Sequence, residues 1–122
     1  MTAKKASLAF GVVFLLIGVL GFFPVFTPNG MLLGIFMVGA VHNIIHLLSG
    51  VAALAASSSE GYATTYFKVF GVVYALVTVI GFAQGNSVLG LIDVNLADNL
   101  LHLVIAAVSL YIGFGRKHAV AV

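Results

Sequence analysis

Phe10-Gly-Val-Val-Phe-Leu-Leu-Ile-Gly-Val-Leu-Gly-Phe22 decides the fold of this chain, because it is apolar on every face and occurs twice. The second copy is Phe70-Gly-Val-Val-Tyr-Ala-Leu-Val-Thr-Val-Ile-Gly-Phe82, at an offset of 60, and 8 of the 13 positions are identical. A strand of a membrane barrel would alternate in polarity over about ten residues. Neither copy alternates, so we expect an all-α protein.

The composition indicates an integral membrane protein. Of the 122 residues, 62% are hydrophobic and 7% are charged, whereas a soluble domain has roughly 25% charged residues. No Asp, Glu, Lys or Arg occurs over residues 6–59 or 69–92. Because one helical span needs about 20 apolar residues, the first stretch has room for two spans and the second for one. Residues 99–115 supply most of a fourth.

The duplication extends to the second helix of each half. Gly34-Ile-Phe-Met-Val-Gly-Ala-Val-His-Asn-Ile-Ile-His-Leu47 aligns with Gly90-Leu-Ile-Asp-Val-Asn-Leu-Ala-Asp-Asn-Leu-Leu-His-Leu103 at an offset of 56. We therefore predict a single four-helix transmembrane domain over residues 1–122, built from two parallel two-helix repeats, about 7–57 and 65–115. Repeats of this kind are related by a pseudo-two-fold axis along the membrane normal.

Proline, glycine and helix-capping residues predict the four helices at about 7–26, 39–57, 65–83 and 95–115. Asn95 with Asp98 three places later has the capping-box arrangement at the start of the last helix. Residues 31–38 and 87–94 are either short strands that pair about the pseudo-two-fold axis, which we favour, or first turns of the helices that follow. The strand interpretation keeps Asp93 out of the lipid.

The positive charges predict the orientation in the membrane. In the four-span arrangement Lys4, Lys5, Lys68, Arg116 and Lys117 all lie on one side, which the positive-inside rule makes cytoplasmic. Both termini are then cytoplasmic. These charges are explained by topology, so we expect no nucleic-acid partner, and the absence of cysteine excludes disulfides and thiolate chemistry.

Polar residues recur near the outer ends of the second and fourth helices. His42-Asn43-Ile-Ile-His46 matches Asp98-Asn99-Leu-Leu-His102, and residues four apart lie on one helix face. Ionisable residues inside a span are expensive, so each one is a functional hypothesis. We expect glycines, amides and imidazoles to line the bundle interior, with Phe, Leu, Ile and Val facing lipid.

Three interpretations of this cluster stay open. The first is a structural clasp, in which hydrogen bonds between helices fix the bundle. The second is a metal site suited to Zn, Fe, Mn or Cu, with the ligands His42, His46, Asp98 and His102. The third is a haem held between His46 and His102, with Asn43 and Asn99 beside it. Proton or electron transfer is a further alternative. No nucleophile–base–acid constellation is present, so we predict no catalytic residues and no enzymatic activity.

Val41-His-Asn-Ile-Ile-His-Leu-Leu-Ser-Gly50 and Val94-Asn-Leu-Ala-Asp-Asn-Leu-Leu-His-Leu103 give the chain a family resemblance. It resembles a bacterial family of small four-helix membrane proteins, catalogued as a domain of unknown function, with Asn-x-x-(His/Asp)-Asn-x-x-His-Leu in each half. Gly39 departs from this pattern, which has Asn there. The resemblance implies a bacterial plasma membrane and no known activity. The expected partners are membrane lipids, and a homo-oligomer or an accessory role in a larger membrane complex stays open.

Overall fold

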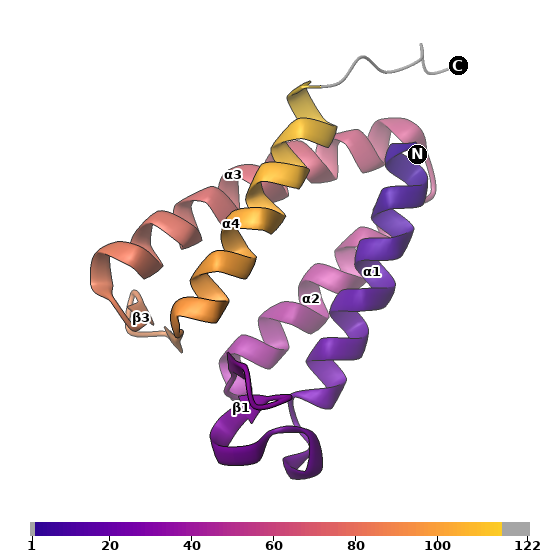
Figure 1. The fold of residues 1–122 in the computed structure, drawn as a ribbon. Coiled ribbons are helices and arrows are strands. Elements are labelled where there is room, and N and C mark those ends of the chain that lie inside the picture. The colour runs from indigo at the N-terminus through magenta and orange to yellow at the C-terminus, as the bar shows by residue number, and fades with distance from the viewer. Residues whose placement is uncertain (1, 116–122) are drawn as a thin grey trace.

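A computed structural model describes residues 2–115, in which the chain folds into four helices (Figure 1). This agrees with the all-α prediction. Three helical segments are long and apolar enough to cross a membrane, Ala3–Leu20, Glu60–Gln84 and Leu96–Gly115, and the remaining helix is apolar but shorter. Arg116 and Lys117 lie outside the described residues. The helices are α1 (Ala3–Leu20), α2 (Ala40–Ala56), α3 (Glu60–Gln84) and α4 (Leu96–Leu110), and α4 continues as a π-helical turn over Tyr111–Gly115.

Close approach between helices depends on glycine. α1 packs along α2, and α3 packs along α4. A Cβ added at Gly50 would lie 2.9 Å from the backbone nitrogen of Leu15 and 3.0 Å from the carbonyl oxygen of Gly11. In α3, a Cβ added at Gly71 would lie 3.0 Å from the nitrogen of Leu110. Small residues at these crossings let the backbones approach closely, as small residues do in membrane helix pairs.

Two helices begin earlier than the sequence patterns predict. α1 starts at Ala3 rather than near Ser7, because the Glu60 carboxylate accepts hydrogen bonds from the Ala3 and Lys4 nitrogens at 3.0 and 3.1 Å. α3 starts at Glu60 rather than near residue 65, because Ser59 caps it by accepting from the Tyr62 nitrogen at 3.0 Å. The first-turn N–H groups that a helix leaves free are therefore partly satisfied by side chains.

α1 ends earlier than predicted, at Leu20 instead of about residue 26. Two 3-10 turns, Pro24–Phe26 and Pro28–Gly30, follow it. Each turn begins at a proline, whose ring prevents the continuation of a regular helix. The first half of the chain therefore has a longer connection between its two helices than the second half has.

Short strands form in both outer segments, but they pair locally. β1 (Met31–Leu32) pairs with β2 (Phe36–Met37), and β3 (Ser87–Val88) pairs with β4 (Ile92–Asp93), both antiparallel. The prediction of strands is confirmed, and the prediction that they pair about the pseudo-two-fold axis is wrong. The physical reason is the backbone after β1 and β3, where two successive residues with positive φ reverse the chain at once: Leu33 and Gly34, then Leu89 and Gly90.

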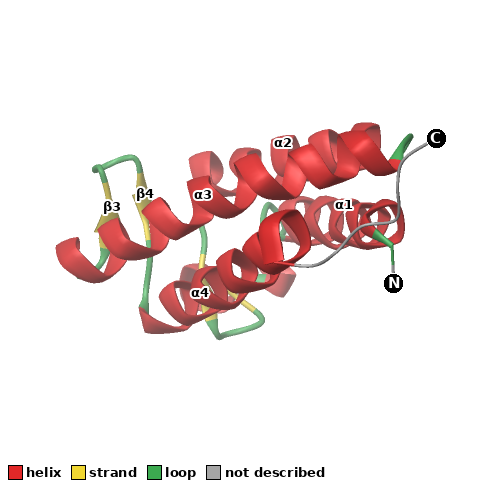
Figure 2. Cartoon of the chain, turned by 90° about the horizontal axis from the view of Figure 1, so that it is seen from above, coloured by secondary structure: helices red, strands yellow, loops and turns green. Residues whose placement is uncertain are grey.

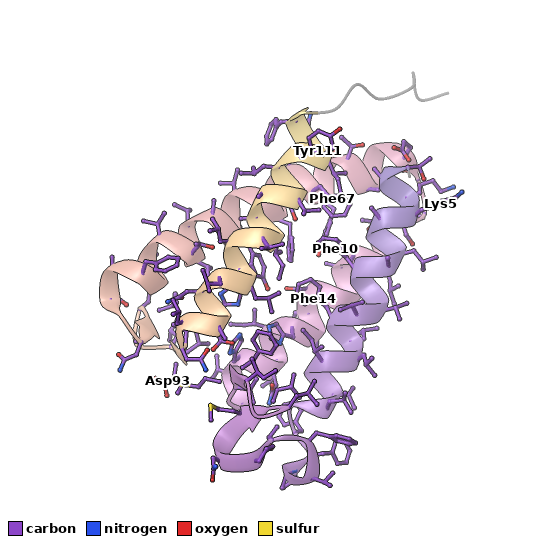
Figure 3. The ribbon with its side chains drawn as sticks, viewed as in Figure 1. Lys5, Phe10, Phe14, Phe67, Asp93 and Tyr111 are labelled. Carbon is purple, nitrogen blue, oxygen red and sulfur yellow. The ribbon has the colours of Figure 1, made fainter. Side chains whose placement is uncertain are left out.

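The two hairpins lie at one end of the molecule. Figure 1 shows the N-terminus, the α2–α3 connection and the end of α4 at the opposite end, and Figure 2 again shows β3 and β4 far from the N-terminus. Asp93 is exposed on its hairpin, away from Lys5 in Figure 3. The acidic and basic side chains labelled there are thus separated along the length of the helices.

Aromatic rings fill the centre of the bundle. Phe14, Phe67, Phe70 and Tyr74 are all buried, and Phe10 meets Phe67 edge-on with 5.0 Å between ring centroids. Figure 3 shows Phe10, Phe14 and Phe67 directed between the two helix pairs. The prediction that phenylalanine faces lipid is wrong for these rings, because glycine and amides are too small to fill the space where α1 meets α3, and large rings gain more dispersion contact there.

Candidate functional site

Three histidines converge where α2 and α4 approach each other. His42 and His46 lie one turn apart on α2, and His102 comes from the second turn of α4. All three are buried, and one ring nitrogen of each lies within 4.8 Å of the other two. The ring centroids of His42 and His46 are 4.4 Å apart, and those of His42 and His102 are 5.7 Å apart.

Most of the ring nitrogens in this cluster lack hydrogen bonds. Nδ1 and Nε2 of His42, and Nδ1 of both His46 and His102, are buried without a partner among residues 2–115. An unpaired buried polar atom costs about 1–3 kcal/mol. Water, a ligand or a metal ion bound to these nitrogens would remove that cost.

Asp98, the fourth predicted metal ligand, is buried but occupied with capping α4. Its Oδ2 accepts from the Asn95 nitrogen at 3.1 Å, and its own nitrogen donates to Asn95 Oδ1 at 2.9 Å. This is the predicted capping box. Asn95 also donates through Nδ2 to the carbonyl oxygen of Ile35 at 2.9 Å, which ties α4 to the β1–β2 hairpin.

Gly39 explains why His42 is not used in the same way as Asp98. Gly39 is the N-cap of α2 and offers no side-chain hydrogen bond. A capping box needs partners at both the N-cap and the third helical position, so His42 has no reciprocal partner there. Its ring lies with His46 and His102 instead. The absence of a capping side chain at Gly39 thus coincides with the extra imidazole in the cluster.

Asn43 and Asn99 pack against glycine rather than joining the histidines. A Cβ added at Gly21 would overlap the Asn43 side-chain oxygen, and one added at Gly81 would overlap that of Asn99. Both oxygens are buried without a hydrogen-bond partner in the described part of the chain. Each amide therefore fills the crossing within its own helix pair, α1 with α2 or α3 with α4.

Aromatic rings pack against the histidine cluster. Phe14 lies 5.6 Å from His46 and Tyr74 lies 5.4 Å from His102, centroid to centroid. Phe14 and Tyr74 occupy the same position in the two sequence copies, but we did not predict that their rings lie beside the histidines. The signal that was available is this alignment itself, since the two rings lie 60 positions apart, as the copies do.

These features define a small helical protein whose apolar helices are compatible with a membrane and whose buried histidine cluster lies in the first two turns of α2 and α4, next to the hairpins. The chain belongs to the family described as "Domain of unknown function (DUF4383)", whose model matches residues 4–115. This confirms the resemblance to an uncharacterised family. No curated protein and no solved structure matches the chain.

Proposed function

We propose that this protein binds a divalent transition metal, zinc in the first instance, through His42, His46 and His102. The observation that carries the proposal is the convergence of three buried ring nitrogens within 4.8 Å of one another. In a tetrahedral zinc site with Zn–N bonds of about 2.1 Å, two nitrogens are about 3.4 Å apart. Side-chain rotations that bring the nitrogens closer by up to about 1.4 Å would complete such a site. Imidazole is a preferred ligand of Zn, Cu, Fe and Ni.

The two rival interpretations of the cluster have less support. A hydrogen-bonded clasp requires partners for the imidazoles, and four of their six ring nitrogens are buried without one in residues 2–115. A haem between His46 and His102 requires a flat slot as wide as the macrocycle. His42 lies 4.4 Å from His46 and 5.7 Å from His102, centroid to centroid, and blocks such a slot.

The expected outcome of metal analysis is one zinc per chain. The full-length protein is purified in detergent, loaded with Zn²⁺, dialysed and measured by elemental analysis, beside a variant in which His42, His46 and His102 are all replaced by leucine. The wild type should retain stoichiometric zinc and the variant should not. Equal zinc in both samples, or none in the wild type, would contradict the proposal.

We also propose that all four helices span the membrane, with both termini cytoplasmic and the two repeats related by a pseudo-two-fold axis along the membrane normal. In support, the hairpins lie at one end and the N-terminus at the other (Figure 1), and the second hairpin and α4 each begin 56 residues after β1 and α2. α2, with 17 residues, is about 26 Å long at 1.5 Å per residue, close to the roughly 30 Å hydrocarbon core.

This orientation predicts where single cysteines react with an impermeant thiol reagent. Asn29→Cys and Asn86→Cys should be labelled in intact cells, and Ser58→Cys only after the cells are opened. The chain has no native cysteine, so the background is clean. Labelling of Ser58→Cys in intact cells would refute the proposed topology. Protection of both hairpin-side cysteines would refute it as well.

A further inference from the structure

A cavity of about 570 Å³ opens between α2 and α3 beside the histidine cluster. Its walls come from α2, from α3 and from the β3–β4 hairpin, and His42 and His102 line it as well. Ligand pockets have volumes of about 300–1,000 Å³, so this groove is large enough for a small organic molecule. None of the lining residues is Asp, Glu, Lys or Arg.

The absence of charge in the lining restricts the chemistry of the ligand. A phosphate or carboxylate head group buried here would lose its hydration without gaining a compensating cation, which is expensive in a medium of low dielectric constant. A neutral molecule avoids this cost. The groove therefore favours a neutral, membrane-dissolved ligand over an anionic phospholipid or fatty acid.

A row of aromatic rings runs along the α3 side of the groove. Tyr66 stacks on Phe70 at 4.8 Å with 19° between the ring planes, and Phe70 lies 4.3 Å from Tyr74, centroid to centroid. The row continues from Tyr74 to His102 at 5.4 Å. Flat rings pack well against such a surface in offset or edge-on geometries.

The unsatisfied polar atoms of the groove lie at the hairpin end. His42 and His102 are 3% and 2% exposed, and three of their four ring nitrogens have no partner in the described residues. Towards the other end, the Tyr66 hydroxyl already donates to the Ser49 carbonyl oxygen at 3.1 Å. Between Thr65 and Val77, both of which line the groove, α3 rises by about 18 Å at 1.5 Å per residue, enough for an extended hydrocarbon tail.

We propose that this groove binds a neutral amphiphile of the quinone or quinol class, entering sideways from the membrane. The flat head lies at the histidine end, where an imidazole N–H donates to a ring oxygen, and the hydrocarbon tail lies along α2 and α3. The proposal goes beyond metal binding and does not require it, although the two sites share His42 and His102.

The test uses the full-length protein in detergent micelles with decylubiquinone as the probe, titrated calorimetrically with and without a chelator. Saturable one-to-one binding is expected, at least about ten times tighter than that of decylbenzene, which has the same tail and no oxygens. Decanoate should not compete. Equal affinity for decylbenzene, competition by decanoate, or no saturable binding in either condition would overturn the proposal.

Two neighbouring valines supply a matched pair of variants. Val73 lines the groove and Val72 does not, and both are 47% exposed. Val73→Trp should weaken decylubiquinone binding at least about tenfold, and Val72→Trp should leave it unchanged. Val69→Trp, which also fills the groove, serves if Val73→Trp does not fold. Equal effects at positions 72 and 73 would contradict the assignment of the site.

The same samples separate this proposal from the metal proposal. Zinc content is measured on the wild type and on Val73→Trp. Quinone binding without stoichiometric zinc refutes the metal site alone. Zinc binding without quinone binding refutes the groove alone. Loss of zinc from Val73→Trp would show that the variant disturbs the histidine cluster, and Val69→Trp then decides the result.

Discussion

Replacing His46 by leucine is expected to remove the stabilisation that zinc gives to the protein. At a free Zn²⁺ concentration one hundred times the dissociation constant, binding stabilises the wild type by about 2.7 kcal/mol. Loss of a direct ligand should weaken binding by at least the roughly 100-fold that a lost outer-shell partner can cost. At the same zinc concentration, the stabilisation of the His46→Leu variant by zinc is then about 0.4 kcal/mol. The measurement is the unfolding free energy in detergent with and without zinc.

Without zinc, we expect the His46→Leu replacement to keep or raise the unfolding free energy instead of lowering it. His46 carries a buried nitrogen without a partner among residues 2–115, and leucine fills a similar volume without polar atoms. The metal-free His46→Leu protein should therefore be as stable as the metal-free wild type or more stable. A loss of stability that is equal with and without zinc would contradict the metal site and favour a structural clasp.

His118→Leu is the matched control for this experiment. His118 is the fourth histidine of the chain, and it lies outside the described residues. Its replacement should leave the zinc-dependent stabilisation unchanged. Combining His46→Leu with His102→Leu should add little to the loss caused by either change alone, because residues that share one ligand do not contribute additively.

The sequence was informative about the histidines because helix geometry is local. The spacing of His42 and His46 places their rings on one face of any helix, and their match with Asp98 and His102 indicated a shared polar region. The spacing does not decide which of four candidate ligands is already occupied. Asp98 is held by Asn95, whereas the corresponding position in α2 follows a glycine N-cap. The consequence of that single difference became visible only in three dimensions.

Fold prediction succeeded where one physical constraint dominates and failed where several compete. Long apolar stretches in lipid must form helices, because backbone groups cannot remain unpaired there, and four helices are present. The choice between Phe14 facing lipid and Phe14 facing the interior has no such constraint, since lipid is as apolar as the protein interior. Packing between helices decides it, and the contact partners, Phe70 and His46, are far away in the sequence.

Gly50→Ala is expected to destabilise the protein by about 1–3 kcal/mol, the usual cost of overpacking. The added methyl group would lie 2.9 Å from the Leu15 nitrogen and 3.0 Å from the Gly11 carbonyl oxygen. These are backbone atoms that cannot rotate away, so α1 and α2 must separate. The effect should appear in equilibrium unfolding in detergent, and also as weaker zinc binding, because His46 lies one turn away on α2.

Gly61→Ala is the matched control for Gly50→Ala, because it makes the same chemical change in a helix where nothing lies within 4 Å of the added Cβ. Alanine has a higher helix propensity than glycine by up to about 1 kcal/mol, so this variant should be as stable as the wild type or slightly more stable. If Gly50→Ala is stabilised like Gly61→Ala, then α1 and α2 do not approach at Gly50.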